Sequence, residues 1–402
     1  MKKALKILTC CLFVLRCGNP NDYKEEQIIT FNLKEITRTT NVKLSDLGFI
    51  DIDYVPLETN EQGLIQRTIN LGSSGDKLII GESYFIIRQY NTILKFRNDG
   101  SFVAKIGKEG RGPTEFQTCH DVESDMNGQR IYVVDGWKQK LFFYSDSGDF
   151  IKAIDFPLQG FGYFRFVNGN FLCYYDNHLG NIEISFNLID SSGKIIKNYP
   201  NKYPFVKYKN DAYGFVHENL FYRFDDLLFK KEVYSDTIYV YKNMEFRPHL
   251  VIEVGDRLIT PKVRSELAGL ELAKNYITPR NLFEFGEYVY YEFTYKFDFS
   301  NTLNYSFIGS KKRDFQVFIK PENGIINDLD GGPNILPLTI KDDNTLIGCV
   351  DALQLKRHVA SETFTKSTPK HPEKKKELEE LANRLKETDN PVLVLVRLKK
   401  PD

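Results

Sequence analysis

The feature that most constrains this chain is a hairpin that recurs at a nearly constant interval. Three segments each contain an apolar strand, a polar turn ending in glycine and a second strand: Ile93–Ile106, Leu141–Ile154 and Phe186–Tyr199. Their turn glycines are spaced by 48 and then 45 residues, at Gly100, Gly148 and Gly193. Asp-Gly and Ser-Gly between alternating apolar runs favour hairpins, because glycine accepts the positive φ of such turns. Two weaker copies follow at Ile238–Ile252, which lacks the turn glycine, and at Val317–Asp328, with Gly324 at the turn.

Two further strands are expected before each hairpin. The nearer set is Asp76–Gly81, Gln129–Asp135, Asn170–Asp176, Asp226–Glu232 and Glu287–Tyr295. The farther, innermost set is Arg67–Leu71, His120–Ser124, Tyr163–Val167, Leu220–Phe224 and Leu282–Phe285. Four strands in units of about 45–50 residues are typical of β-propeller blades.

The two ends of the chain together supply a sixth blade. Its strands are expected at Ile335–Ile340, Thr345–Asp351, Pro391–Leu398 and, near the N-terminus, Ile50–Glu58. Closing the ring with strands from both ends removes the free sheet edges. We therefore predict an all-β fold, a six-bladed β-propeller of four-stranded antiparallel blades over residues 44–399. Two inserted helices are expected at about 261–276 and 369–388, where apolar residues recur at helical spacing.

Size and charge agree with a modular β fold and argue against some functions. A chain of 402 residues exceeds the size at which one core stops growing. The 31 Phe and 23 Tyr against three Met favour strands, where aromatic residues pack well. Lys plus Arg and Asp plus Glu both number 54, so no overall field favours nucleic acid, and no nucleic-acid partner is predicted.

The N-terminal residues indicate export. Residues 1–17 have a basic start and a short apolar core, as in a signal peptide, and the apolar run is too short to span a bilayer. Val14–Cys17 resembles a bacterial lipobox, although Arg16 departs from its pattern. We therefore expect lipidation at Cys17, a tether over residues 18–43 and an address at the cell envelope, with the outer membrane favoured. If Cys17 is not lipidated, the protein is expected to be secreted or periplasmic.

Metal, cofactor and catalytic motifs are missing from the sequence. The six histidines are dispersed, and neither H-E-x-x-H nor G-x-S-x-G occurs. Three cysteines beyond the signal fit no metal pattern or disulfide framework, namely Cys119, Cys173 and Cys349. We interpret them as small buried hydrophobic residues, with a Cys119–Cys173 bridge as the alternative. No metal, cofactor or catalytic residue is predicted.

The glycine-rich stretch Lys105–Phe116, KIGKEGRGPTEF, suggests a phosphate-binding loop at first sight. A P-loop requires Lys-Ser/Thr after its last glycine and then a helix, whereas Gly112 is followed by Pro113-Thr114-Glu115. The stretch is better interpreted as the link from the outer strand of blade 1 to the inner strand of blade 2. Such a link crosses one face of the disc, where Lys108 and Arg111 could rim a pocket.

With these segments in place, the chain resembles the six-bladed β-propeller lipoproteins of Bacteroidetes, a group related to NHL-repeat propellers. The resemblance covers about Leu44 to Lys399 and rests on several segments: Tyr54–Glu58, Ile106–Phe116, Ile131–Ile151, Tyr234–Tyr241 and Asn390–Lys399. It implies a propeller fold and a cell-envelope address. It implies no established reaction and no catalytic residues.

The candidate ligand site follows from the propeller geometry, because innermost strands line the central channel. Basic and ionisable residues lie on or beside the expected inner strands and the link, namely Arg67, Lys108, Arg111, His120, Asp121, Arg165, Arg223 and Arg280. Arginine binds carboxylates and phosphates in bidentate fashion, so the hypothesis is an anionic or polyhydroxylated ligand, such as a glycan fragment, at the channel mouth. The alternative is that the arginines form structural bridges to Asp225, Asp226 and Glu284. Two roles are also open for the aromatic residues Trp137, Tyr174 and Tyr175. They stack on a sugar ligand or, more simply, they pack within blades.

The function predicted from sequence is a ligand-binding or protein-interaction module at the cell envelope, whose only contact with the membrane is a lipid anchor. An envelope enzyme, a lyase or hydrolase acting on a glycan or peptide, is the alternative. A purely structural partner protein is a third class, expected to show a featureless channel.

Overall fold

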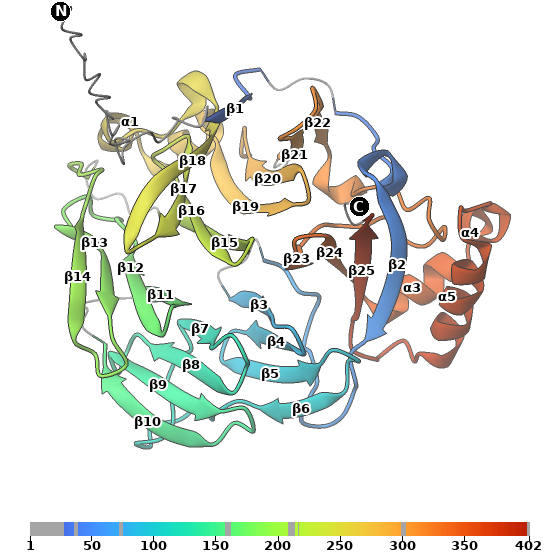
Figure 1. The fold of residues 1–402 in the computed structure, drawn as a ribbon, viewed down its shortest axis with the longest axis horizontal. Helices are drawn as coiled ribbons and strands as arrows, with labels where there is room; N and C mark the ends of the chain where they lie inside the picture. The colour runs from blue at the N-terminus through green and yellow to red at the C-terminus, as the bar shows by residue number, and fades with distance from the viewer. Residues whose placement is uncertain are drawn as a thin grey trace, which may run out of the picture.

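The computed structural model describes residues 28–35, 39–71, 75–156, 162–207, 214–215, 217–298 and 303–399. It is a six-bladed β-propeller, in which six sheets stand around a central axis. Figure 1 looks down that axis and shows the innermost strands β3, β7, β11, β15, β19 and β23 facing one another across the centre. The predicted fold class is confirmed.

The first three blades have four antiparallel strands each, which follow one another along the chain from the channel outward. Blade 1 consists of β3 (Asp76–Ile80), β4 (Tyr84–Gln89), β5 (Thr92–Arg97) and β6 (Phe102–Lys105). Blade 2 consists of β7 (Asp121–Ser124), β8 (Arg130–Asp135), β9 (Lys140–Ser145) and β10 (Phe150–Asp155). Blade 3 consists of β11 (Gly162–Val167), β12 (Asn170–Tyr175), β13 (Ile184–Ile189) and β14 (Ile195–Pro200).

Of the remaining blades, blade 5 keeps this pattern, whereas blades 4 and 6 each include a strand from near the N-terminus. Blade 4 has β15 (Asn219–Phe224), β16 (Leu227–Glu232), β17 (Thr237–Lys242) and β18 (Glu245–Glu253), followed at its outer edge by β1 (Ile29–Asn32). Blade 5 has β19 (Thr278–Phe285), β20 (Tyr288–Thr294), β21 (Asn304–Ser310) and β22 (Gln316–Ile319). Blade 6 has β23 (Thr339–Asp342), β24 (Thr345–Val350), β25 (Val392–Leu398) and β2 (Phe49–Pro56).

The recurring turn glycines behave as predicted. Gly100, Gly148 and Gly193 have φ values of 85°, 89° and 91°, which an L side chain rarely adopts. A Cβ atom on Gly100 would lie 2.1 Å from the carbonyl oxygen of Pro56 in blade 6, so this turn packs directly on the neighbouring blade. Blade 4 lacks the glycine because Asn243 and Met244 take the positive φ values instead, 53° and 57°.

Ring closure joins the two ends of the chain, as predicted. In blade 6, β25 lies between β24 and β2 and pairs antiparallel with both. Val396, for example, pairs with Ile52 on one side and Leu346 on the other, and all three side chains are fully buried. The last strand of the chain is therefore held by main-chain hydrogen bonds along both of its edges.

Residues 18–43 were expected to form a tether, but the part of this range that the structure describes contains a strand. β1 pairs in parallel with β18, from Ile29 opposite Leu250 to Asn32 opposite Glu253. Phe31 and Leu33 are buried, and Phe31 packs edge-on against Phe307 of blade 5 at 5.5 Å. This segment adds a strand to the blade because its apolar side chains gain burial there. Residues 1–27, including the predicted signal and Cys17, lie outside the described residues.

The strands predicted in three blades need correction, and in blade 6 the inner strand is β23 (Thr339–Asp342) rather than Ile335–Ile340. The innermost strand of blade 1 is β3 rather than Arg67–Leu71, which forms no strand and leads into β3. In blade 5 the hairpin predicted at Val317–Asp328 is wrong: β22 is the outermost strand, and its partner β21 was missed. Gly324 lies instead in the loop that follows, where its φ is 61°.

The helices are shorter and more numerous than predicted. The first insertion splits into α1 (Pro261–Glu266) and α2 (Gly269–Asn275), because Leu267 and Ala268 are extended between them. The second insertion is α5 (Pro372–Arg384), and it packs beside α3 (Ala352–Val359) and α4 (Glu362–Lys366), which were not predicted. These three helices lie outside blade 6 in Figure 1. Short 3-10 turns occupy Leu44–Leu47, Gly255–Arg257 and Pro321–Asn323.

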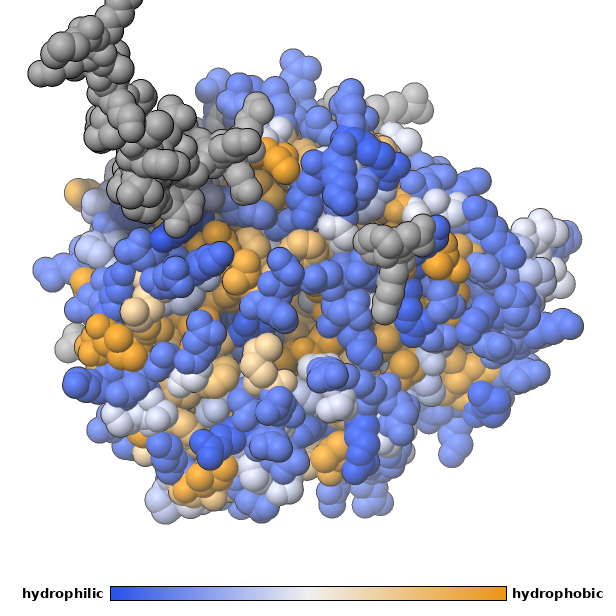
Figure 2. Space-filling model, in the orientation of Figure 1, coloured by the Kyte–Doolittle hydropathy of each residue, from blue (hydrophilic) through white to orange (hydrophobic). Residues whose placement is uncertain are grey.

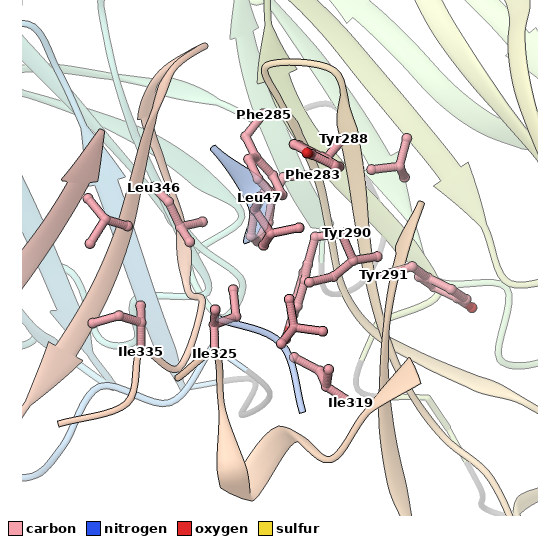
Figure 3. Packing of buried hydrophobic residues seen from close by; sticks show 14 of the residues in the cluster. Leu47, Phe283, Phe285, Tyr288, Tyr290, Tyr291, Ile319, Ile325, Ile335 and Leu346 are labelled. Atoms are coloured by element: carbon pink, nitrogen blue, oxygen red, sulfur yellow. The ribbon is translucent and has the colours of Figure 1, made fainter. Parts of the chain in front are cut away.

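Hydrophobic clusters between neighbouring blades hold the ring together. Separate clusters join blades 6 and 1, blades 1 and 2, blades 2 and 3, and blades 3 and 4, and one large cluster joins blades 4, 5 and 6. Figure 3 shows part of the large cluster, where Phe283, Phe285 and Tyr290 of blade 5 face Leu47. The rings of Phe285 in blade 5 and Phe49 in blade 6 stack at 5.7 Å. Aromatic residues thus form the packing between blades, as their abundance in the sequence suggests.

Cys119, Cys173 and Cys349 are free, so the alternative Cys119–Cys173 bridge is not formed. Cys119 and Cys173 are buried, and burial raises the pKa of the Cys119 thiol to about 11. Both therefore act as small hydrophobic residues, as predicted, whereas Cys349 is partly exposed.

Among the described residues, no helix is both long enough and apolar enough to cross a membrane. Hydrophilic residues cover most of the face seen in Figure 2, and smaller hydrophobic patches interrupt them.

Candidate functional site

A cavity of about 180 Å³ occupies the channel where the innermost strands begin. Each of the six blades contributes to its wall through its innermost strand: Lys77, Asp121, Arg165, Phe221, Arg280 and Thr339. Ionisable groups of both signs and several aromatic rings therefore converge on one polar cavity. This is the candidate functional site.

An ion-pair network centred on Asp121 forms one wall. The Asp121 carboxylate lies 2.7 Å from Lys77 Nζ and 2.9 Å from Arg165 Nη1, and it accepts main-chain N–H bonds from Val122 and Phe164. Glu123 adds a second carboxylate, 2.8 Å from Lys77 Nζ and 3.4 Å from Arg165 Nη1. Burial alone would raise the pKa of Asp121, but Lys77 and Arg165 outweigh it and lower that pKa to about 2.

Arg165 is held between aromatic rings as well as by the carboxylates. Its guanidinium carbon lies 5.4 Å from the ring centre of Tyr174 and 5.0 Å from that of Phe221. Cation–π contacts of this kind stabilise a partly desolvated arginine. Arg165 is therefore fixed in the wall, and its charge is largely compensated by Asp121 and Glu123.

The opposite wall carries Arg280, which faces an acidic group of blade 3 across the cavity. Arg280 Nε lies 3.1 Å from Glu292 Oε1, and its side chain keeps 27% of its surface exposed. Across the cavity, Asp176 lies 3.4 Å from His178 Nε2, and burial together with the charge of Asp176 raises the pKa of the Tyr163 hydroxyl. The Tyr163 ring stacks on Tyr174 at 5.3 Å, so a flat aromatic surface lies beside these charges.

His217 and Glu218 immediately precede β15 and line the same cavity. His217 Nε2 is 2.9 Å from the Leu71 carbonyl oxygen, and burial, assisted by the charges of Arg280 and Arg165, lowers its pKa. Glu218 is only 3% exposed. Burial and the nearby Asp176 raise the pKa of Glu218 to about 7.

Three of the residues predicted for the site line the cavity: Asp121, Arg165 and Arg280. Arg67 lies beside it, 2.5 Å from Asp76, which does line it. His120 stands next to the lining residue Tyr163, with 6.2 Å between ring centres, and burial lowers its pKa. Arg223 instead donates to the Phe166 carbonyl, outside the cavity wall.

Arginines of the inner strands and their surroundings form ion pairs with carboxylates, as the structural alternative expects, but the partners differ from those predicted. Glu284 bonds His249, Lys311 and Tyr222 rather than an arginine. Asp225 uses its main-chain N–H to bond Asp343. The arginine partners are Asp76 and Asp121 on inner strands and Glu292 on β20, the second strand of blade 5.

The glycine-rich link at Lys105–Phe116 folds on itself and does not reach the cavity. Lys108 Nζ pairs with Glu115 at 3.0 Å with 79% of its side chain exposed, and Arg111 is exposed. Glu115 accepts from the Gly112 N–H, and Lys138 Nζ bonds the carbonyls of Gly112 and Glu115. Lys108 and Arg111, which were expected to rim a pocket, are not among the residues that line the cavity, and these local bonds keep the link compact.

Sequence reasoning missed several lining residues, namely Lys77, Arg88, Asp176, His217 and Glu218. Lys77 was missed because the inner strand of blade 1 was placed too early. His217 and Glu218 had a usable signal, since they precede an inner strand just as His120 precedes β7. Of the aromatic candidates, Tyr174 lines the cavity, whereas Trp137 is 68% exposed and does not pack within a blade as expected.

Within the described residues, no group of three or more His, Cys, Asp or Glu side chains is placed to hold a metal ion. The fold and site together define a six-bladed propeller with a polar, charge-balanced channel cavity. The chain matches the domain of unknown function DUF4934 over residues 28–397, and it belongs to that family. No curated protein matches the sequence.

Two solved structures share the fold. One is a Bacteroides fragilis protein whose name describes it as inferred to be exported; it is 18% identical, with a TM-score of 0.64 over 93% of this chain and 100% of that chain. The other is a member of the DUF4221 family from Bacteroides vulgatus, 12% identical, with a TM-score of 0.51 over 87% of this chain and 97% of that chain. At such identities the likeness establishes the architecture alone.

Proposed function

We propose that this protein is an exported, envelope-located binding module whose channel cavity holds a small polyhydroxylated ligand, such as a glycan fragment. The observation that carries the proposal is the convergence of all six inner strands on one polar cavity of about 180 Å³. Export is supported by the signal-like N-terminus and by the name of the Bacteroides fragilis neighbour. Lipidation at Cys17 and attachment to the outer membrane belong to the same proposal.

The charge balance favours a hydroxylated ligand over a simple anion. Four cationic side chains line the cavity, Lys77, Arg88, Arg165 and Arg280, but four carboxylates line it too, Asp76, Asp121, Asp176 and Glu218. For a free phosphate, repulsion by those carboxylates offsets the attraction of the cations. Sugar hydroxyls both donate and accept hydrogen bonds, so they match a wall that offers donors and acceptors together. The Tyr163 ring supplies an apolar surface against which a sugar ring can lie.

An envelope hydrolase or lyase fits the geometry less well. Glu218 is the group with the most suitable pKa, yet it is 3% exposed, and its carboxylate accepts bonds from the Asn177 N–H and the Tyr234 hydroxyl. A proton-transfer group must reach the substrate within hydrogen-bond distance. Binding is therefore the function that this arrangement supports best.

Titration calorimetry tests the proposal with D-glucose, D-glucuronate and short oligosaccharides, and inorganic phosphate serves as the anion control. We expect saccharide binding that weakens at least about tenfold, or ~1.4 kcal/mol, in Arg280→Ala. Arg223→Ala is the matched control, because its guanidinium bonds Phe166 outside the cavity wall. Binding of phosphate alone, or equal losses in both variants, would contradict the proposal, and saccharide cleavage during the titration would favour the enzyme alternative.

A further inference from the structure

The channel cavity is small for a saccharide chain. Its volume is about 180 Å³, whereas pockets that enclose a drug-sized ligand measure roughly 300–1,000 Å³. The cavity lies at the end of the channel where the innermost strands begin, so it is close to one face of the disc. If one sugar ring occupies the cavity, the further units of a chain lie outside it, on that face.

An exposed aromatic residue lies beside the cavity on this face. Tyr90 directly follows β4, and the last residue of β4, Gln89, pairs with Asp76, the first residue of β3. Asp76 lines the cavity, so Tyr90 lies at the same end of the channel as the cavity. Tyr90 is 59% exposed, which leaves much of the residue open to a ligand.

Tyr90 is held in place by the cavity wall and by the turn that precedes β3. Arg88 lines the cavity and donates from Nε to the Tyr90 carbonyl at 2.9 Å, and the Tyr90 N–H donates to the Gly75 carbonyl at 2.7 Å. The guanidinium carbon of Arg67 lies 5.2 Å from the centre of the Tyr90 ring, and its Nη2 lies 2.5 Å from Asp76. A Cβ atom on Gly75 would lie 2.8 Å from the ring, so the ring packs on the glycine backbone.

The backbone conformation of Tyr90 is unusual for a tyrosine. Its φ is 52°, in the left-handed region, where glycine, asparagine and aspartate are favoured. Residues held in such conformations gather at ligand-binding sites. A turn that only reversed the chain would be more stable with asparagine or glycine here, so the aromatic ring is the feature of this turn that calls for a function.

We propose that Tyr90 forms a second sugar subsite at the mouth of the channel, on which the next unit of an oligosaccharide stacks. This inference rests on the proposed function and narrows the ligand class from small saccharides to chains of two or more units. The C–H groups on the flat side of a sugar ring pack on an aromatic ring. The Arg67 guanidinium beside Tyr90 supplies hydrogen-bond donors for sugar hydroxyls. One unit then lies in the cavity against Tyr163, and its neighbour lies on Tyr90.

Titration calorimetry on the full chain compares D-glucose with maltotriose and cellotriose, which cover α and β linkages. We expect at least one trimer to bind about fivefold more tightly than glucose, which is the effect of an ordinary aromatic stacking contact. Tyr90→Asn suits the left-handed backbone but removes the ring, so it should abolish this gain. Tyr90→Phe keeps the ring and should retain the gain. Circular dichroism melts check that each variant is folded.

The matched control is Trp137→Ala, which removes another exposed aromatic ring. Trp137 is 68% exposed in the corresponding turn of blade 2, between β8 and β9. Its N–H bonds Asp135, which does not line the cavity, whereas Tyr90 bonds the lining residue Arg88. Trp137→Ala should therefore keep the preference for the trimer.

Two results would overturn the inference. One is that neither trimer binds the wild type more tightly than glucose does. The other is a gain that persists in Tyr90→Asn or that is lost equally in Trp137→Ala. In both cases glucose still binds, so the proposed function stands. If none of these saccharides binds, the proposed function fails and this inference fails with it, so the two failures are distinguishable.

Discussion

At the scale of single residues, the two buried carboxylates of the channel are stabilised to different extents. Asp121 is met by Lys77, Arg165 and two main-chain N–H groups, and its pKa falls to about 2. Glu218 has no cationic partner at ion-pair distance among the described residues, and its pKa rises to about 7. The difference arises from partners rather than from burial, since both residues are less than one-tenth exposed.

Asp121→Asn should destabilise the protein by about 3 kcal/mol at pH 7, because it leaves two partly buried cations with only Glu123 as an anionic partner. Urea unfolding measures this cost. Asp155→Asn, which breaks the exposed pair with Lys140, is the control and should cost less than about 1 kcal/mol. Equal losses would show that the channel network does not stabilise the fold.

The lowered pKa of Asp121 predicts how the free energy of unfolding falls in acid. Its folded pKa of about 2 lies below the ordinary value of 3.8, so its contribution is complete above about pH 4 and is lost as the pH falls through 2. The wild type should therefore lose about 2 kcal/mol between pH 5 and pH 2 that Asp121→Asn does not lose. Parallel pH–stability curves for the two proteins would contradict the assignment.

At the scale of elements, β1 shows how a segment outside the repeats joins a blade. Only one of its side chains is well buried: Phe31 is 3% exposed, whereas Ile29 is 38% exposed. Phe31→Ala should cost about 3 kcal/mol in urea unfolding, because it empties a packed position against Phe307. Ile29→Ala on the same strand should cost less than half as much, and similar costs would mean that β1 does not dock through Phe31.

The hairpins could be predicted from sequence because each carries its information locally, in a turn glycine and alternating apolar residues. Arg67–Leu71 was mistaken for a strand because nothing within such a short segment shows whether it pairs with a neighbouring strand. β21 was missed because its hairpin has no turn glycine, and β1 because four residues give no periodicity. The site was predicted in part, since ion-pair partners such as Glu292 and Asp76 depend on packing across strands that sequence does not specify.

At the scale of the whole molecule, the ring depends on β25, the strand between β24 and β2. Val396→Asp should prevent folding or lower the Tm by more than 10 °C, because it places an unpaired carboxylate between two strands, at a cost of several kcal/mol. Arg397→Ala on the same strand removes half-exposed pairs with Asp51 and Asp53 and should cost about 1 kcal/mol or less. Circular dichroism melts of the two variants make the comparison, and a folded Val396→Asp protein of near-normal Tm would contradict this closure.

The central claim is that the channel cavity is the ligand site, and a crystal structure with a bound saccharide tests it most directly. Crystals soaked in the saccharide that gives the largest heat should show density between Arg280 and Tyr163, inside the cavity of about 180 Å³. Density only at the outer rim of the blades, with the channel unchanged, would contradict the account.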